Sequence, residues 1–185
     1  MTKTELRARM LNNLRDFADR APASEAICAA IRRHEAWTSA RSVCAFFPLP
    51  SEPQIALLWG EDRARTFCFP RIRDGGVELI RIDDPELRRH ATWKLDAPEL
   101  ASAPLVAPDQ VDLFLVPGLA FTRSGARLGR GGGYYDRLLP RRSAGSVAIG
   151  VCFGLQLVET IAGEPHDHDV DAVISERGLV AGPVG

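Results

Sequence analysis

Apolar residues follow two different patterns along the chain, helical spacing near the N-terminus and short continuous runs further on. Two stretches near the N-terminus carry apolar residues three or four positions apart, and this spacing is typical of one face of a helix. The first set is Leu6, Met10, Leu14 and Phe17, and the second is Ala26, Ile27, Ala30 and Ile31. They predict a helix over residues 3–19 and a second helix that starts near Pro22, because proline fits a first helical turn.

Short apolar runs bounded by proline or glycine predict strands. These runs cover residues 43–47, 66–69, 77–82, 111–116, 147–153 and 172–175. The turn residues Asp74-Gly75-Gly76 predict that the second and third strands form a hairpin. Short helices are expected at 54–60 and 134–139, and residues 83–110, which contain four prolines, are expected to be mostly irregular.

Apolar strands that alternate with helices predict an α/β fold with a largely parallel sheet. The length of 185 residues favours one domain over residues 1–185. Ligands of such sheets bind beyond the carboxyl ends of the strands. The loop that follows Val116, at the end of the clearest core strand, is therefore where a site is expected.

The composition argues against several classes of binding partner. A net charge of −1 and 7% aromatic residues argue against nucleic acid. The polar N-terminus and the lack of a long apolar run predict a cytoplasmic protein without membrane contact. Four widely spaced cysteines, Cys28, Cys44, Cys68 and Cys152, predict buried, reduced thiols. The chain has 21 arginines but two lysines, Lys3 and Lys94.

A glycine-rich segment follows the strongest strand. Glycines at 129, 131, 132 and 133 precede the predicted helix, with Arg127 and Arg130 beside them and Asp136 in the first helical turn. Glycines allow backbone N–H groups to approach an anion, arginines bind phosphate oxygens, and a carboxylate can hold Mg²⁺. Neither G-x-G-x-x-G nor the P-loop pattern is present. From these residues alone, a phosphate site and a plain tight connection are equally open.

The whole motif resembles a known family. The string RLGRGGGYYDR, preceded by PGLAF, is similar to the signature of the 5-formyltetrahydrofolate cyclo-ligases. Four further segments resemble that family in order and spacing: Lys3-Thr4-Glu5-Leu6-Arg7, Phe46-Phe47-Pro48 followed by Glu52, Phe69-Pro70-Arg71, and His166-Asp167 with Asp171. Some members have lysine in place of Gly132, which would leave Lys3, Arg7, Arg127 and Arg130 to supply the positive charge here.

The resemblance implies a three-layer α/β domain with a mixed sheet between helices. It also implies that the protein uses ATP and Mg²⁺ to convert 5-formyltetrahydrofolate into 5,10-methenyltetrahydrofolate. A monomer is the simplest expectation. The expected nucleotide residues are Lys3, Thr4, Glu5, Leu6, Arg7, Arg127, Leu128, Gly129, Arg130, Gly131, Gly132, Gly133, Tyr134 and Tyr135. The expected folate residues are Phe47, Glu52, Arg130, Gly131, Gly132, Gly133 and Tyr134, the catalytic ones Arg130, Tyr135 and Asp136, and the metal ligands Asp136 and Asp171.

Each assignment has a plainer alternative. Lys3 and Arg7 can belong to a solvated helix face, Glu52 can be an ordinary loop carboxylate, and Phe46 is expected to be core. The run from His166 to Asp171 can hold a transition metal, but its spacing matches no standard zinc site, so an acidic loop is favoured. The whole chain can be a non-catalytic nucleotide- and folate-binding protein, or a kinase or ligase that acts on another small acid.

Overall fold

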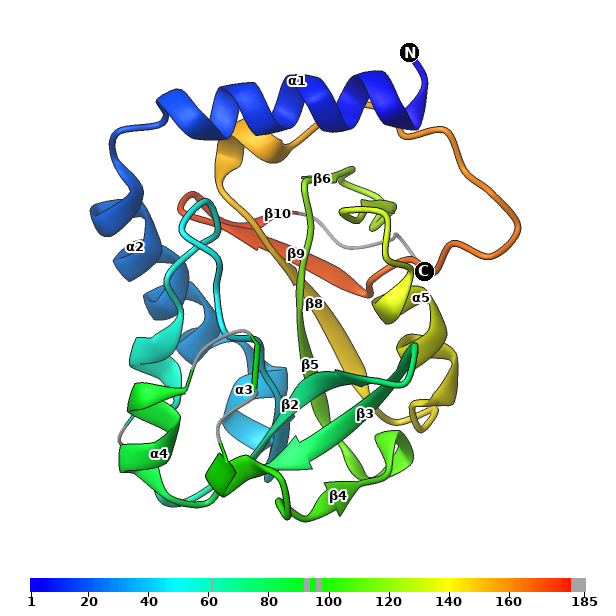
Figure 1. The fold of residues 1–185 in the computed structure, drawn as a ribbon. Coiled ribbons are helices and arrows are strands. Elements are labelled where there is room, and N and C mark those ends of the chain that lie inside the picture. The colour runs from blue at the N-terminus through cyan, green and yellow to red at the C-terminus, as the bar shows by residue number, and fades with distance from the viewer. Residues whose placement is uncertain (61, 92–93, 96–97, 181–185) are drawn as a thin grey trace.

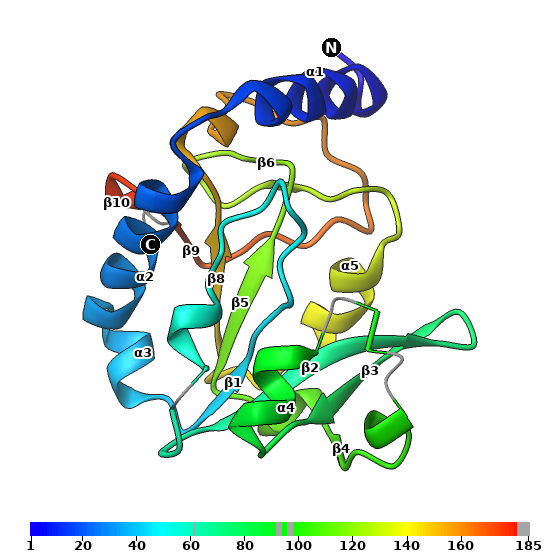
Figure 2. The ribbon, with the colours of Figure 1, turned by 60° about the vertical axis from the view of Figure 1, so that its left-hand side comes forward.

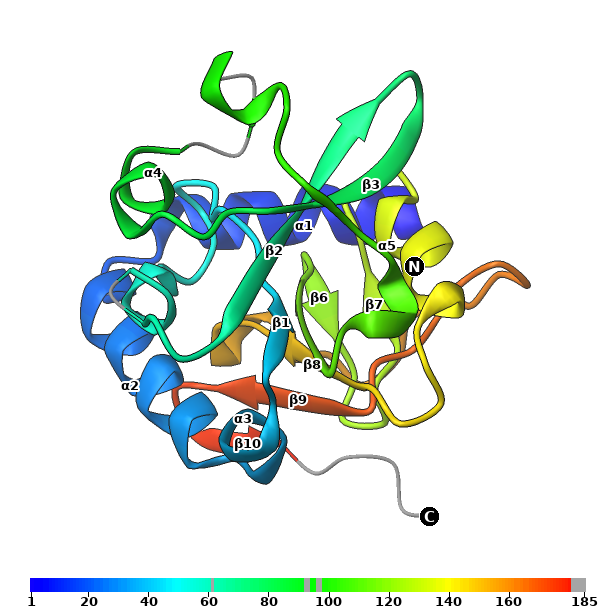
Figure 3. The same cartoon turned by 90° about the horizontal axis from the view of Figure 1, so that it is seen from below.

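The computed structural model describes residues 1–60, 62–91, 94–95 and 98–180. Within this part, eight strands form one sheet in the order β10-β9-β8-β5-β1-β2-β3-β4. The strands are β1 (Ser42–Cys44), β2 (Thr66–Arg73), β3 (Gly76–Arg81), β4 (Leu105–Val106), β5 (Leu113–Pro117), β8 (Val147–Val151), β9 (Ala172–Ser175) and β10 (Gly178–Val180). Figure 3 shows the β2–β3 hairpin on the side of the central strands opposite β9 and β10.

The five central strands, β9, β8, β5, β1 and β2, run parallel, and the outer strands β3, β4 and β10 are added in antiparallel pairs. The predicted α/β class with a mixed, largely parallel sheet is thus confirmed. Because the central strands share one direction, their carboxyl ends meet at one edge of the sheet. Figure 2 shows the arrow of β5 pointing toward that edge, where α1 (Lys3–Asp16) lies across the strand ends.

The other helices cover the two faces of the sheet. Figure 2 shows α2 (Arg20–Arg33) and α3 (Glu35–Ser39) on one side of the central strands and α5 (Tyr134–Leu138) on the other. The short helix α4 (Pro85–His90) precedes β4 in the chain. Helix α1 begins sharply because Thr2 and Glu5 form a capping box, in which each side chain binds the backbone N–H of the other.

Strand β5 is the core strand that the apolar run at residues 111–116 predicts. Four of its five residues, Leu113 to Val116, are fully buried, and they alternate between two apolar clusters, one on each face of the sheet. Leu113 and Leu115 join the cluster under α1, α2 and α3, whereas Phe114 and Val116 face the cluster that contains Leu138 of α5. A strand buried on both faces is the expected state of a parallel sheet.

Several predicted boundaries were wrong. The first helix ends at Asp16, and the second starts at Arg20, before Pro22. Residues 54–60 contain only one 3₁₀ turn, and the stretch 83–110, expected to be irregular, contains α4, β4 and two further 3₁₀ turns. Strand β10 and the small hairpin of β6 (Ala120–Phe121) and β7 (Arg127–Leu128) were not predicted, because strands of two or three residues leave no readable periodicity.

The small hairpin is fixed to the sheet by one aromatic side chain. Phe121 is fully buried, and its ring occupies the space beside two glycines, Gly118 after β5 and Gly150 in β8. A Cβ atom would lie 2.7 Å from the ring at Gly118 and 2.5 Å from it at Gly150, closer than any normal contact. Both glycines therefore leave the space that the ring occupies.

The described cysteines agree with the prediction of reduced thiols. All four are free and buried, and burial raises the pKa of Cys28 to about 11.

None of the helices in the described part of the chain has both the length and the apolar content needed to cross a membrane. Figure 1 shows the ribbon from α1 to the last strands.

The contact between Phe121 and Gly150 gives a first prediction. We expect Gly150→Ala to lower the free energy of unfolding by about 1–3 kcal/mol, because the added methyl group overpacks a core without free space. Urea denaturation measures this change. Gly163→Ala is the matched control: no atom lies within 4 Å of its added Cβ, so we expect a change below about 0.5 kcal/mol. Equal stabilities of the two variants would contradict this packing.

Candidate functional site

The glycine-rich loop, Gly129–Gly133, runs from β7 to α5 and depends on its glycines. Gly131 and Gly133 have φ angles of 105° and 63°, which side chains other than glycine rarely adopt. A Cβ atom at Gly132 would lie 2.4 Å from the ring of Tyr134. The backbone of this loop is therefore exposed to an approaching ligand. Helix α5 has only five residues, so its dipole adds little, and anion binding here depends on loop N–H groups and arginines.

The N-terminal helix lies against this loop. The Nε atom of Arg7 donates to the carbonyl of Gly129 over 3.0 Å. The ammonium group of Lys3 is bound between Asp167, at 2.7 and 2.8 Å, and Glu164, at 2.7 Å. Segments from both ends of the chain thus meet beside the loop. The alternative of a purely solvated helix face is wrong for both cations.

The other three residues of this N-terminal stretch contribute differently. Glu5 closes the capping box of α1, and Leu6 is buried in the apolar core. Thr4 is exposed. The structure therefore leaves Lys3 and Arg7 as the side chains of this stretch that face neighbouring loops, because the helical period turns the residues between them away.

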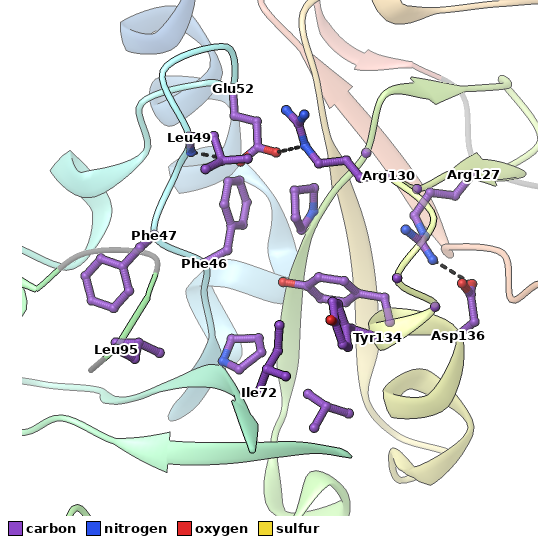
Figure 4. A pocket seen from close by; sticks show the side chains of 18 residues that line it. Phe46, Phe47, Leu49, Glu52, Ile72, Leu95, Arg127, Arg130, Tyr134 and Asp136 are labelled. Atoms are coloured by element: carbon purple, nitrogen blue, oxygen red, sulfur yellow. Dashed lines mark hydrogen bonds and ion pairs between the residues drawn. The ribbon is translucent and has the colours of Figure 1, made fainter. Parts of the chain in front are cut away.

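A cavity of about 500 Å³ lies between the glycine-rich loop, the end of β5 and the β2–β3 hairpin. We call it the aromatic cavity. Its aromatic and aliphatic lining comes from Phe46, Phe47, Tyr134, Tyr135, Leu49, Ile72, Val77 and Leu95, and its charged lining from Glu52, Arg127, Arg130 and Asp136 (Figure 4). Its size and its mixture of apolar walls with few polar groups are typical of a site for a small organic ligand.

One end of the aromatic cavity holds an ion pair between its two sides. Arg130 of the glycine-rich loop donates from Nε to Oε1 of Glu52 over 3.0 Å, and from Nη2 to Oγ of Ser51 over 2.9 Å. The other carboxylate oxygen of Glu52 accepts the backbone N–H of Leu49 over 3.0 Å. Glu52 is buried, so it is not an ordinary loop carboxylate.

A second ion pair lies under the glycine-rich loop. Arg127 donates from Nη2 to Oδ1 of Asp136 over 2.6 Å, and its side chain is 4% exposed. Its Nε atom has no hydrogen-bond partner among the described residues. The guanidinium carbon lies 5.6 Å from the ring centre of Tyr135, whose pKa is raised well above its ordinary value by burial. Tyr135 is therefore a neutral hydrogen-bond donor at physiological pH.

The aromatic lining differs in part from the expectation. Phe46, expected to be core, is buried and also lines the aromatic cavity. One face of Phe47 stacks on Phe69 with ring centres 4.3 Å apart. The sequence did not reveal Leu49, Ile72, Val77 or Leu95 as lining residues; the exposure of Ile72, an apolar residue at the end of a hairpin, becomes visible only in the structure.

Asp171 lies away from the aromatic cavity. Both of its oxygens are bound by Arg142, and Oδ2 also accepts the backbone N–H of Ala148 over 2.7 Å. Asp171 does not line the cavity and would have to release Arg142 before it could bind a metal. In the acidic loop, Glu164, His166 and Asp167 lie close together, but the ammonium group of Lys3 already occupies the carboxylates of Glu164 and Asp167.

These features define a class of protein: an α/β protein with an apolar, aromatic-lined ligand cavity next to a cation-rich glycine loop. Residues 1–176 match the model of the 5-formyltetrahydrofolate cyclo-ligase family, and the chain belongs to that family. It is 34% identical to the 5-formyltetrahydrofolate cyclo-ligase of Mycolicibacterium smegmatis over 97% of both chains.

Solved structures show the same similarity. The 5,10-methenyltetrahydrofolate synthetase of Aquifex aeolicus superposes with a TM-score of 0.82 at 27% identity, over 97% of this chain and 92% of that one. The synthetase of Mycoplasma pneumoniae, at 21% identity, shares the fold with a TM-score of 0.75 over 95% and 99% of the two chains. The family and the fold that the resemblance implied are thus confirmed.

The carboxylates next to the site give a prediction about acid stability. Partial burial acts to raise the pKa values of Asp167 and Asp171, but hydrogen bonds and charge from Lys3 and Arg142 more than offset it, so both pKa values are lowered. A lowered folded-state pKa stabilises the protein above the unfolded value of about 3.9, and this stabilisation is lost as the pH falls through the folded value.

We therefore expect the melting temperature to fall as the pH decreases below about 5, and to fall less steeply in Asp167→Asn and Asp171→Asn. Thermal unfolding at a series of pH values measures this slope. Glu25→Gln, at an exposed position of α2, is the control and should keep the steep slope. Parallel curves for all four proteins would show that these two ion pairs do not contribute.

Proposed function

We propose that this protein is a 5-formyltetrahydrofolate cyclo-ligase, which uses ATP to convert 5-formyltetrahydrofolate into 5,10-methenyltetrahydrofolate, ADP and phosphate. The observation that supports this most directly is the position of the aromatic cavity. Its apolar, aromatic-lined interior suits a pterin ring, and it is bordered directly by the glycine-rich loop. A phosphate group held at that loop would lie next to a ring held in the cavity.

The chemistry requires activation of a poor electrophile. The formyl oxygen attacks the γ-phosphorus, so an O–P bond forms and the bond to the ADP oxygen breaks. N10 then attacks the formyl carbon and loses its proton, and the C–O bond breaks as phosphate leaves. Positioning and charge neutralisation are the main contributions of a protein to phosphoryl transfer.

Residues of this chain suit those tasks. Lys3, Arg7 and Arg130 would neutralise phosphates, and the backbone of Gly131, Gly132 and Gly133 would donate to them. Glu52 would accept hydrogen bonds from the pterin, and Phe47 and Tyr134 would pack against it. The neutral Tyr135 would donate to the oxygen that leaves with the phosphate when the C–O bond breaks. Arg127, which is buried against Asp136, would position that carboxylate instead of binding phosphate itself.

The residues also fit a magnesium ion. Mg²⁺ prefers oxygen ligands and is usually bound by one or two carboxylates together with substrate phosphates. Asp136 meets this description, because it lines the aromatic cavity beside the glycine-rich loop and only its Oδ1 atom is bound by Arg127. When bound, Mg²⁺ would neutralise negative charge on the phosphates. Asp171 is left out of this assignment because Arg142 occupies it.

An absorbance assay tests the proposed activity. Purified protein with 5-formyltetrahydrofolate, ATP and Mg²⁺ should produce the absorbance of 5,10-methenyltetrahydrofolate, and omission of ATP should abolish the signal. Ligand binding without product would favour the alternative of a non-catalytic binding protein. Turnover of a different acid in a substrate panel would favour another ligase or kinase. We also expect a monomer, which size-exclusion chromatography measures.

Two variants test the assigned residues. We expect Arg130→Ala and Asp136→Asn to lower kcat/KM at least about tenfold each, because each removes a charged contact to the phosphates or their metal. Arg9→Ala, an exposed arginine of α1, is the matched control and should keep wild-type activity. Wild-type kcat/KM in both folded variants would refute the assignment of this loop to the nucleotide.

A further inference from the structure

The ion pair of Glu52 and Arg130 joins two groups that the proposed function assigns to different ligands. Arg130 comes from the glycine-rich loop and would bind phosphate. Glu52 comes from the loop after β1 and would bind the pterin. Figure 4 shows the two side chains facing one another from opposite sides of the aromatic cavity, at an Nε–Oε1 distance of 3.0 Å.

The side chains of Arg130 and Glu52 differ in how easily they can move away from their ion pair. The side chain of Arg130 is 36% exposed, whereas that of Glu52 is 8% exposed. Arg130 can therefore turn toward a ligand at the loop, but Glu52 cannot follow it. Removing one partner from a buried ion pair is strongly unfavourable, because the remaining charge has lost both water and its counter-ion.

No other cation in the described part of the chain is paired with Glu52. Arg127 also lines the aromatic cavity, but it is bound to Asp136. If a phosphate draws Arg130 away, the N–H of Leu49 is the one donor to the Glu52 carboxylate that remains among the described residues. A pterin ring carries an amino group and a ring N–H on one edge, and these two donors match the two oxygens of a carboxylate.

We propose that the Glu52–Arg130 ion pair couples the two ligand sites, so that nucleotide and folate each bind more tightly when the other is present. The nucleotide draws Arg130 to its phosphates, and the pterin donors then replace Arg130 at Glu52. Folate on its own must compete with Arg130, and nucleotide on its own leaves Glu52 without a counter-ion. This inference rests on the proposed function, from which it takes the identity of both ligands.

Calorimetry on the full chain tests the coupling. Dissociation constants are measured for 5-formyltetrahydrofolate with and without a saturating non-hydrolysable ATP analogue and Mg²⁺, and for the analogue with and without the folate. We expect each ligand to tighten the other at least about tenfold, which corresponds to one charged hydrogen bond. The two factors must be equal, because binding linkage is reciprocal.

Substitution of Glu52 distinguishes a role in coupling the two ligands from a merely structural role. In Glu52→Gln, Arg130 is no longer held by a negative charge. The nucleotide analogue alone should therefore bind several-fold more tightly than it binds the wild type, whereas folate should bind more weakly and the coupling factor should approach one. A merely structural role would weaken both ligands. Arg130→Lys, which keeps the charge but loses the planar group, should also reduce the coupling.

Ser51→Ala is the matched control. It removes the other hydrogen bond of Arg130 without changing any charge, so the coupling should persist. Independent binding of the two ligands to the wild type, or coupling that survives in Glu52→Gln, would overturn the inference. Failure of the wild type to bind either ligand would overturn the proposed function itself. Thermal melting of each variant establishes that it is folded.

Discussion

The position of the site depends on the packing of one phenylalanine ring against two glycines. Phe121 lies between the end of β5 and the middle of β8, and this contact fixes the β6–β7 hairpin over the carboxyl edge of the sheet. The glycine-rich loop continues directly from β7. Its backbone is therefore held near the strand ends by the core, together with the hydrogen bond from Arg7 to the carbonyl of Gly129. A rigid support of this kind is what a flexible, glycine-containing loop requires if it is to present its N–H groups in one arrangement.

Charge compensation is the second constraint on the site. The cations expected to meet phosphate, Lys3 and Arg130, are paired with carboxylates in this structure, and Arg7 donates to a backbone carbonyl. Asp136 is likewise paired with Arg127. A cluster of unpaired cations would repel itself and destabilise the fold. The observed pairs keep the site neutral and ordered, and a ligand has to exchange partners with them when it binds.

The sequence predicted the central sheet better than its edges, for a physical reason. Strands such as β5 and β8 are long, continuously apolar runs, whereas β4, β6 and β7 have two residues each and are defined only by their neighbours. Residue types and the family resemblance located the glycine-rich loop and its cations. They could not show that Glu52 pairs with Arg130, 78 residues away, or that Asp171 is held by Arg142. Such pairings depend on chain topology, which residue chemistry alone does not contain.

The residues of the site also come from distant parts of the chain, and this affects when the site can form during folding. Lys3 near the beginning meets Asp167 near the end, 164 residues apart, and the central strand β1 pairs with β5 some seventy positions later. Contacts between such distant positions require large loops to close before they stabilise anything. During synthesis, the pairing of Lys3 with Asp167 can therefore form only after Asp167 has left the ribosome. A nascent chain stopped before Asp167 would lack this contact and would therefore hold an incomplete site.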